Sequence, residues 1–368
     1  MRIAFERLAE GSIVEVHEDE LLPVAACSRC AVTGGDEVVC TYVRSSALGI
    51  NDFVPMICWS SDGGITWAGH RPMWPELSDS FSIIGSVSRS PAGWLCFYGT
   101  RTAIDEPGDS FWCEATQGLK TNELIWAESS DGGRSWGAPR SIPMLIPGSA
   151  EAPGAMCITA SGRMLGPYAP YPTFDPTLRV DRSQIAGALS DDRVSWRYSE
   201  VQRFQDPESV GAESWIVELS DRTLLSTSWN SSAKHGDYPN QYSLSFDAGT
   251  TWSAAKSTEV MGQSTALAAL PNGKALFIYN QRKQGEPGVW MAVVKPSEAD
   301  FGIEANEIIW AGGKGTQSGS SGEHSDWRDF SFGEPSVTVL RDGTLLVALW
   351  CIQPTGRGIR YVKLRMRH

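Results

Sequence analysis

Four carboxylates of this sequence stand at corresponding points of a repeating pattern. Asp79, Glu151, Glu213 and Glu334 each lie at the start of an apolar, strand-like run. Carboxylates that gather at one place cannot all ionise cheaply, because each charge raises the pKa of its neighbours. One member can then act as a general acid while another acts as a base or a nucleophile. These residue types indicate general acid–base chemistry, provided that the fold brings them together.

Arginines and aromatic residues occupy related points. Arg29 begins the first run, and the strands that follow these runs end in polar or aromatic residues. Guanidinium groups donate several hydrogen bonds, and aromatic rings offer flat surfaces to sugar faces as readily as to a protein core. We assign to substrate binding the residues Arg29, Arg44, Asp79, Arg101, Glu151, Tyr168, Trp229 and Arg282. Trp229 is the first choice for stacking, and the other aromatic candidates are Trp112, Tyr168, Tyr171 and Tyr238.

Short β-strands must position these residues. Six times the chain shows an apolar strand, a tight turn and another apolar strand, which is the pattern of a β-hairpin. The hairpins are predicted at residues 28–44, 82–99, 153–169, 214–229, 264–280 and 335–352.

A second repeat follows several of these hairpins. Ser60–Trp67 reads SSDGGITW, and the motif recurs at Ser129–Trp136 and Ser245–Trp252, with a worn copy around Asp191. Its aspartate accepts backbone N–H groups of a turn, its glycine takes a positive φ, and its tryptophan packs between units. A motif that occurs three times cannot be one active site. We therefore interpret it as structural and predict that the three tryptophans are buried and lie opposite the site.

The two repeats together give units of four strands. Four-stranded units repeated around an axis form a β-propeller. The last unit lacks its fourth strand, and Ser12–Val16 near the N-terminus has strand character. The sequence therefore predicts an all-β, six-bladed β-propeller over residues 1–368, a single domain closed by the N-terminal strand.

The box motif on such a propeller resembles the sialidase superfamily, also called neuraminidases or BNR-repeat proteins. Cys27-Ser28-Arg29-Cys30 resembles the segment that carries the first of that family's three carboxylate-binding arginines. The segment around Asp52 resembles the loop of its acid/base aspartate, and the segment around Glu213 that of its active-site glutamate. The resemblance implies that Asp52 is the general acid, although Asn51-Asp52 is also an ordinary turn sequence.

This sequence departs from the family pattern at two places. Trp229 stands where the second arginine is expected, and Arg282 is the nearest substitute for the third. Glu334 replaces the family's tyrosine nucleophile, and a carboxylate nucleophile suits an uncharged anomeric centre. The leading hypothesis is thus an exo-acting glycoside hydrolase with Asp52, Glu213 and Glu334 as catalytic residues, whose terminal sugar is not a typical sialic acid.

Two other function classes stay open. A polysaccharide lyase on a similar propeller needs a base beside a uronic carboxylate, and His235 next to Tyr238 would serve. A noncatalytic sugar-binding propeller would keep its ligand after replacement of Asp52. Unsaturated, ultraviolet-absorbing product would identify the lyase.

Composition excludes several other roles. The chain has 31 lysines and arginines against 43 acidic residues, a formal net charge of −12, which disfavours nucleic acid and anionic membranes as partners. We expect no export signal, hence a cytoplasmic location, because residues 1–25 lack a basic start followed by an apolar run. Most of the 8 cysteines lie in apolar runs and are expected to be reduced. Cys27 and Cys30 lack partner ligands, so neither a metal nor a cofactor is predicted.

Overall fold

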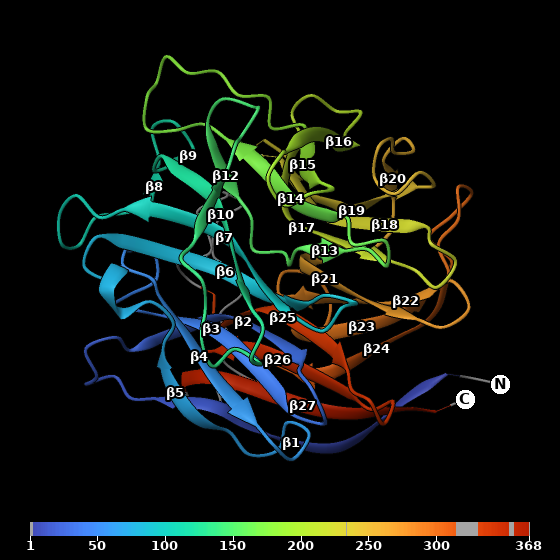
Figure 1. Ribbon diagram of the computed structural model, residues 1–368. Coiled ribbons are helices and arrows are strands. Elements are labelled where there is room, and N and C mark those ends of the chain that lie inside the picture. The colour runs from blue at the N-terminus through green and yellow to red at the C-terminus, as the bar shows by residue number, and fades with distance from the viewer. Residues whose placement is uncertain (1–2, 233, 314–329, 353–356, 368) are drawn as a thin grey trace.

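The computed structural model describes residues 3–232, 234–313, 330–352 and 357–367. Its strands form six four-stranded antiparallel blades around a central axis, which confirms the predicted all-β propeller (Figure 1). Blade 1 contains β2 (Val24–Val32), β3 (Val38–Ser45), β4 (Val54–Ser60) and β5 (Ala68–Pro72). Blade 2 contains β6 (Phe81–Arg89), β7 (Leu95–Ala103), β10 (Asn122–Ser129) and β11 (Arg140–Ile142). Blade 3 contains β12 (Ser149–Glu151), β14 (Met164–Tyr171), β15 (Gln184–Ser190) and β16 (Arg197–Arg203), and β13 (Cys157–Ile158) also pairs with β14.

The other three blades follow the same order. Blade 4 contains β17 (Val210–Glu218), β18 (Leu224–Ser232), β19 (Gly236–Ser245) and β20 (Lys256–Ser257). Blade 5 contains β21 (Gln263–Leu270), β22 (Lys274–Gln281), β23 (Gly288–Val294) and β24 (Ile303–Ala311). Blade 6 contains β25 (Phe332–Val339), β26 (Leu345–Cys351), β27 (Arg357–Arg367) and β1 (Ala4–Val16).

Blade 6 joins the two ends of the chain, as the sequence predicts. β1 pairs antiparallel with β27, from Ala4 opposite Arg367 to Val16 opposite Arg357. Figure 1 shows β1 and β27 side by side in this blade. The strand that completes the last blade therefore comes from the other end of the chain, and this pairing closes the ring.

The repeated box motif forms the turn between the third and fourth strands of its blade. Asp131 Oδ1 accepts hydrogen bonds from Ser135 N (2.9 Å) and Ser129 Oγ (2.8 Å), and Asp62 and Asp247 repeat this pattern in their own boxes. In the worn copy the turn residue is Asp192 rather than the assigned Asp191, because Asp192 Oδ1 accepts from Ser195 N at 2.7 Å. Asp191 instead binds Arg163 and Arg197.

The tryptophans of the boxes are half-buried, so the prediction of full burial is wrong. Trp67 and Trp136 each donate their indole N–H to the glycine carbonyl of their own turn, at 3.1 Å in both cases. These rings cover the edge of the hydrophobic core, which consists of clusters between neighbouring blades. Among the described residues, no helix is long and apolar enough to cross a membrane.

Candidate functional site

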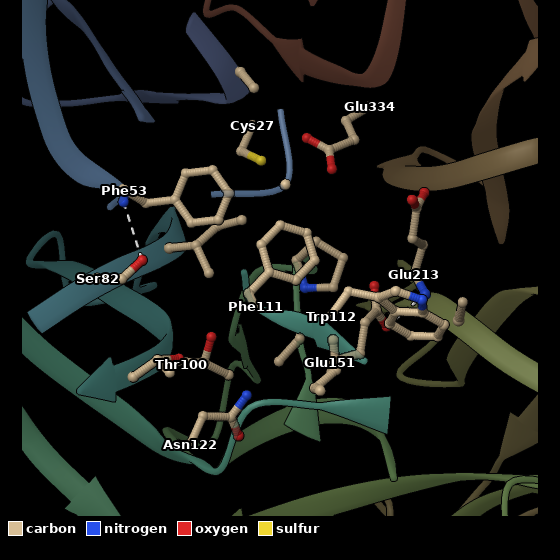
Figure 2. Close-up of a pocket in the computed structure, with 18 of the residues that line it drawn as sticks. Cys27, Phe53, Ser82, Thr100, Phe111, Trp112, Asn122, Glu151, Glu213 and Glu334 are labelled. Carbon is tan, nitrogen blue, oxygen red and sulfur yellow. Dashed lines mark hydrogen bonds between the residues drawn. The ribbon is translucent and has the colours of Figure 1, made fainter. Parts of the chain in front are cut away.

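A pocket of about 210 Å³ opens where the innermost strands of the blades begin (Figure 2). Antiparallel pairing puts the starts of first strands and the ends of second strands at this end of the molecule, while the boxes lie at the opposite end. The volume lies below the roughly 300–1,000 Å³ of sites for drug-sized ligands. It is suited to one compact ligand, such as a single sugar residue.

Much of the pocket lining is aromatic. It includes the rings of Phe53, Phe111, Trp112, Tyr171, Trp229, Phe330 and Trp350. Phe111 and Trp112 come from the connection between β7 and β10, where β8 (Trp112–Cys113) and β9 (Gly118–Leu119) form a small hairpin. Asn51 N donates to the Asp109 carbonyl at 2.7 Å, so this connection is tied to the loop of blade 1. Aromatic faces of this kind bind the apolar faces of sugars or other flat ligands.

Three carboxylates also line the pocket, from Glu151, Glu213 and Glu334. They come from the innermost strands of blades 3, 4 and 6, as Figure 2 shows. The backbone N–H of Glu213 donates to Glu151 Oε2 at 2.9 Å, which brings the two acidic residues into contact. The sequence-based prediction that polar strand starts converge therefore agrees with the arrangement of these three residues.

Local irregularities of the strands aim two of these side chains. β17 has a β-bulge between Ala212 and Trp215, and Glu213 within it has a φ of 48°. β25 has a bulge between Gly333 and Ser336, and Glu334 has a φ of 43°. A bulge adds a residue to one strand and redirects its side chain, and left-handed backbone costs energy for a residue other than glycine. Glu334 stands between Gly333 and Pro335, which mark an irregular point of the strand, whereas Glu213 itself has no glycine or proline directly beside it.

Two buried arginines flank the carboxylates. Arg282 follows β22, lines the pocket and is 3% exposed, and its Nη2 donates to Ser264 Oγ at 3.2 Å. Its guanidinium lies 3.6 Å from the centre of the Phe330 ring. Arg29, also 3% exposed, donates from Nη1 to the carbonyls of Ser28 (2.8 Å) and Glu334 (2.9 Å). Arg29 thus supports the wall of the pocket from behind, whereas Arg282 forms part of its surface.

Burial and mutual repulsion govern the ionisation of the cluster. Burial, followed by the charge of Glu213, raises the pKa of Glu151 well above its usual range. Burial and the charge of Glu334 raise the pKa of Glu213 to about 7. Burial lowers the pKa of Arg282 to about 10, so this arginine stays charged at neutral pH. Three carboxylates face two guanidiniums, and the cluster becomes neutral when one carboxylate keeps its proton.

Some hydrogen-bonding atoms of the cluster are left for a ligand. Within the described residues, Glu334 Oε2 and the Nε and Nη1 atoms of Arg282 are buried without a hydrogen-bond partner. Buried polar groups without partners are rare in folded proteins and ask for an explanation. A ligand that offers both donors and acceptors, as a sugar hydroxyl does, would satisfy both residues.

Several predicted site residues lie elsewhere. Asp52 is absent from the pocket lining, although its neighbours Asn51 and Phe53 belong to it. Asp52 lies in the loop before β4, and its Oδ1 accepts from Ser45 Oγ at 2.7 Å. The geometry therefore does not support Asp52 as the acid of this pocket.

Five of the predicted substrate-binding residues also lie outside the pocket lining, among them Arg29, which is described above. Arg44 pairs with Glu20 at 2.8 Å, and Arg101 pairs with Glu123 at 2.6 Å. Tyr168 is buried in a hydrophobic cluster, and Asp79 is exposed in a turn. Glu151, Trp229 and Arg282 do line the pocket.

Among the other aromatic candidates, Trp112 and Tyr171 line the pocket and Tyr238 does not. The lyase pair is likewise outside it: the rings of His235 and Tyr238 lie 6.4 Å apart, and Tyr238 Oη donates to Asp206 at 2.9 Å. In the part of the chain that the structure describes, no group of three or more His, Cys, Asp or Glu residues is arranged to hold a metal ion.

Sequence reasoning missed several residues of the pocket. Phe53, Phe111 and Phe330 come from loops that carry no repeat. Cys27 and Ser264 also line it, and the spacing of Cys27 to Cys30 suggested only a metal pair without partner ligands. Their strand positions match those of Glu213 and Glu334, so a comparison of the blades could have found them.

Comparisons with known proteins agree with this architecture. Residues 111–312, more than half of the chain, match the family described as "BNR repeat-like domain". No curated protein matches the chain significantly. A solved structure of a protein of unknown function from Dyadobacter fermentans superposes with a TM-score of 0.75 at 18% identity, covering 99% of both chains.

Two further solved structures have described ligands or activities. The NanB sialidase from Streptococcus pneumoniae gives a TM-score of 0.60 at 13% identity, covering 96% of this chain and 70% of that one. The alpha-L-arabinanase of Penicillium chrysogenum, complexed with arabinobiose, gives 0.64 at 14% identity and covers 98% of each chain. At such identities the likeness shows a shared fold alone.

Proposed function

This chain belongs to the BNR repeat-like domain family, and from that premise we propose that it is a glycoside hydrolase acting on a terminal sugar. The observation that carries the proposal is the convergence of Glu151, Glu213 and Glu334 with the buried Arg282 in one small pocket. A sialidase and an arabinanase share the fold, which supports a carbohydrate as the ligand.

The contact between Glu151 and Glu213 supplies the acid. The pKa of each is raised, so the pair holds a proton near neutral pH. This proton passes to the glycosidic oxygen as its bond to the anomeric carbon breaks. Glu334, as a carboxylate, either attacks the anomeric carbon or takes a proton from the water that does so. Glu151 and Glu213 thereby take over the role that the sequence analysis gave to Asp52.

The ligand best suited to the site is a neutral sugar. Only Arg282 presents unused guanidinium donors to the pocket within the described residues, because Arg29 donates to backbone carbonyls. The three nearby carboxylates would repel an additional ligand carboxylate. The aromatic residues of the lining supply stacking surfaces, with Trp229 held by the hydrogen bond from its Nε1 to Asp237 Oδ1 at 3.1 Å.

The test is hydrolysis of a panel of aryl glycosides, neutral, uronic and sialic, by the wild type and the variants Glu151→Gln, Glu213→Gln and Glu334→Gln. The control is Glu304→Gln, which removes a carboxylate paired with Lys274 on the outermost strand of blade 5. Loss of a general acid or base lowers kcat by roughly 10²- to 10⁴-fold. We expect a loss of this size in Glu334→Gln and in at least one variant of the pair, with full activity in the control.

Other outcomes identify other functions. Cleavage that persists in all three pocket variants contradicts the proposal. Binding of a sugar without cleavage of any glycoside assigns the pocket to a noncatalytic carbohydrate-binding protein. Unsaturated product from a uronic substrate assigns it to the lyases.

A further inference from the structure

Four of the six innermost strands share one irregularity. β2, β17, β21 and β25 each contain a β-bulge near their start. Each bulge holds one residue other than glycine with left-handed backbone: Cys27 (φ 56°), Glu213 (φ 48°), Ser264 (φ 53°) and Glu334 (φ 43°). All four residues line the pocket. Such backbone is costly and clusters at functional sites, where the surrounding structure enforces it.

The four positions contain two acidic side chains and two hydrogen-bond donors. Ser264 interacts with the Glu213 carboxylate while it accepts a hydrogen bond from Arg282 Nη2 at 3.2 Å. Cys27 interacts with the Glu334 carboxylate, and Figure 2 shows its sulfur turned toward that carboxylate. Each glutamate therefore has a hydroxyl or thiol from another blade's bulge beside it: Ser264 of blade 5 lies near Glu213 of blade 4, and Cys27 of blade 1 lies near Glu334 of blade 6.

We propose that Ser264 and Cys27 are positioning residues of the site, each of which orients one glutamate by donating a hydrogen bond to its carboxylate. Ser264 accepts from Arg282 and donates to Glu213, so it links the buried guanidinium to the acid. Cys27 donates its S–H to Glu334 and holds that carboxylate toward the ligand. The inference rests on the proposed function in one respect: that function makes Glu213 and Glu334 catalytic residues.

The thiol acts as a donor and not as a nucleophile. Burial, followed by the charge of Glu334, raises the pKa of the Cys27 thiol well above its usual range, so the proton stays on sulfur. A nucleophilic cysteine needs the opposite, a lowered pKa near positive charge. Among the groups around it, Arg29 alone favours the thiolate, and its effect is smaller than that of Glu334.

The charged groups that face Glu213 set the background for a test. They are Glu151 on β12, Glu334 on β25, Arg29 on β2 and Arg282 after β22, with the Tyr171 phenol of β14 nearby. Against this fixed background, the Ser264 hydroxyl stabilises the ionised form of Glu213. Its removal must therefore raise the pKa of Glu213.

The first experiment is a pH titration of the Glu213 carboxyl carbon by NMR in ¹³C-glutamate-labelled protein, with Glu213→Gln to assign the signal. In Ser264→Ala and Ser264→Gly the midpoint should rise by about one pH unit, the effect of a hydrogen bond to a charged group. The glycine variant relieves the strained backbone and the alanine variant keeps it, so a shift common to both reports the hydroxyl. An unchanged midpoint in both variants overturns the assignment of Ser264.

The second experiment follows the Cys27 S–H stretching band by infrared difference spectroscopy, with Cys27→Ser to identify it among the 8 cysteines. In Glu334→Gln the band should move to higher frequency, because a neutral amide is a weaker acceptor than a carboxylate. An unmoved band overturns the assignment of Cys27. Neither readout requires turnover, so shifted signals in a protein that cleaves no glycoside leave this inference standing while the proposed function fails.

Discussion

The backbone N–H of Glu213 donates to a carboxylate oxygen of Glu151 at 2.9 Å, across the junction of blades 4 and 3. This bond offsets part of the repulsion between two acidic side chains that burial already disfavours as charged groups. Because the two carboxyls interact strongly, the proton that they hold belongs to the pair. The pair forms only where two blades meet, so it reports directly on the assembled propeller.

We predict that Glu213 makes folding stability fall as pH rises. Its pKa is about 7 in the folded protein against an ordinary value of 4.5. Between these pH values the folded protein keeps a proton that the unfolded chain releases. The free energy of unfolding therefore falls as pH rises, and the stability that Glu213 contributes below pH 4.5 is lost by about pH 7. Its full size is at most roughly 3 kcal/mol. Urea unfolding at pH 5 and pH 8 should show Glu213→Gln gaining stability relative to wild type at the higher pH. Glu304→Gln should show no such gain, and an equal difference at both pH values contradicts the prediction.

The box turns should matter for stability and not for chemistry. Asp131→Ala removes an acceptor of hydrogen bonds from Ser129 and Ser135, at the end of blade 2 away from the pocket. The free energy of unfolding should fall by about 1 kcal/mol or more, while kcat of the folded protein stays near that of wild type. Asp36→Ala, in an exposed tight turn of blade 1, is the matched control with little effect. Selective loss of turnover in Asp131→Ala would refute a structural role.

Sialosides should be poor substrates. Arg282 is the one arginine that lines the pocket in the described chain, and Arg29 is engaged by backbone carbonyls. Each missing charge-assisted contact to a ligand carboxylate weakens binding by roughly 1.5–3 kcal/mol, about ten- to a hundredfold. The measurement is kcat/KM for an aryl sialoside beside the best neutral aryl glycoside. A sialoside value equal to or above the neutral one would overturn the assignment of substrate class.

Ring closure should be sensitive to Gly358. This residue of β27 has a φ of 132°, and a Cβ there would overlap the Val14 carbonyl of β1. Gly343 has a φ of 77° and open space around a built Cβ, so Gly343→Ala costs about 1–2 kcal/mol of backbone strain alone. Gly358→Ala should cost clearly more, measured by urea unfolding. Equal losses of unfolding free energy in the two variants would contradict the prediction, because the contact of the new Cβ with the Val14 carbonyl would then cost nothing.

Much of the fold could be predicted because its signals are local and repeated. A box places its turn through the hydrogen bonds of a single aspartate, as Asp131 shows, and three copies fix the unit. The missing fourth strand of the last unit predicts the role of Ser12–Val16, which β1 confirms. The adjacent pair Asp191-Asp192 defeated the same reasoning, because Asp191 keeps the motif's spacing to Trp196 whereas Asp192 keeps its spacing to Ser190. In the structure Asp192 accepts the turn amides.

The site was predictable only in part, since it depends on contacts between blades and on side-chain direction. Glu151, Glu213 and Glu334 share strand positions, so the repeat located them. Arg101 ends a strand in the corresponding way, yet Glu123 on the neighbouring strand holds its guanidinium. The direction of Asp52 follows from the loop that presents it, and no residue type in the sequence encodes that direction.

The contact between blades 6 and 1 makes the pocket depend on closure of the ring. Arg29 of blade 1 donates to the Glu334 carbonyl of blade 6, so part of the pocket wall exists only once the circle of blades is complete. That completion joins strands from the two ends of the chain, the kind of distant contact whose loop-closure entropy slows folding. A molecule bound in the pocket then stabilises the contact between blades 6 and 1. It should slow opening of the ring and raise apparent stability with its own concentration, as any ligand selective for the folded state does.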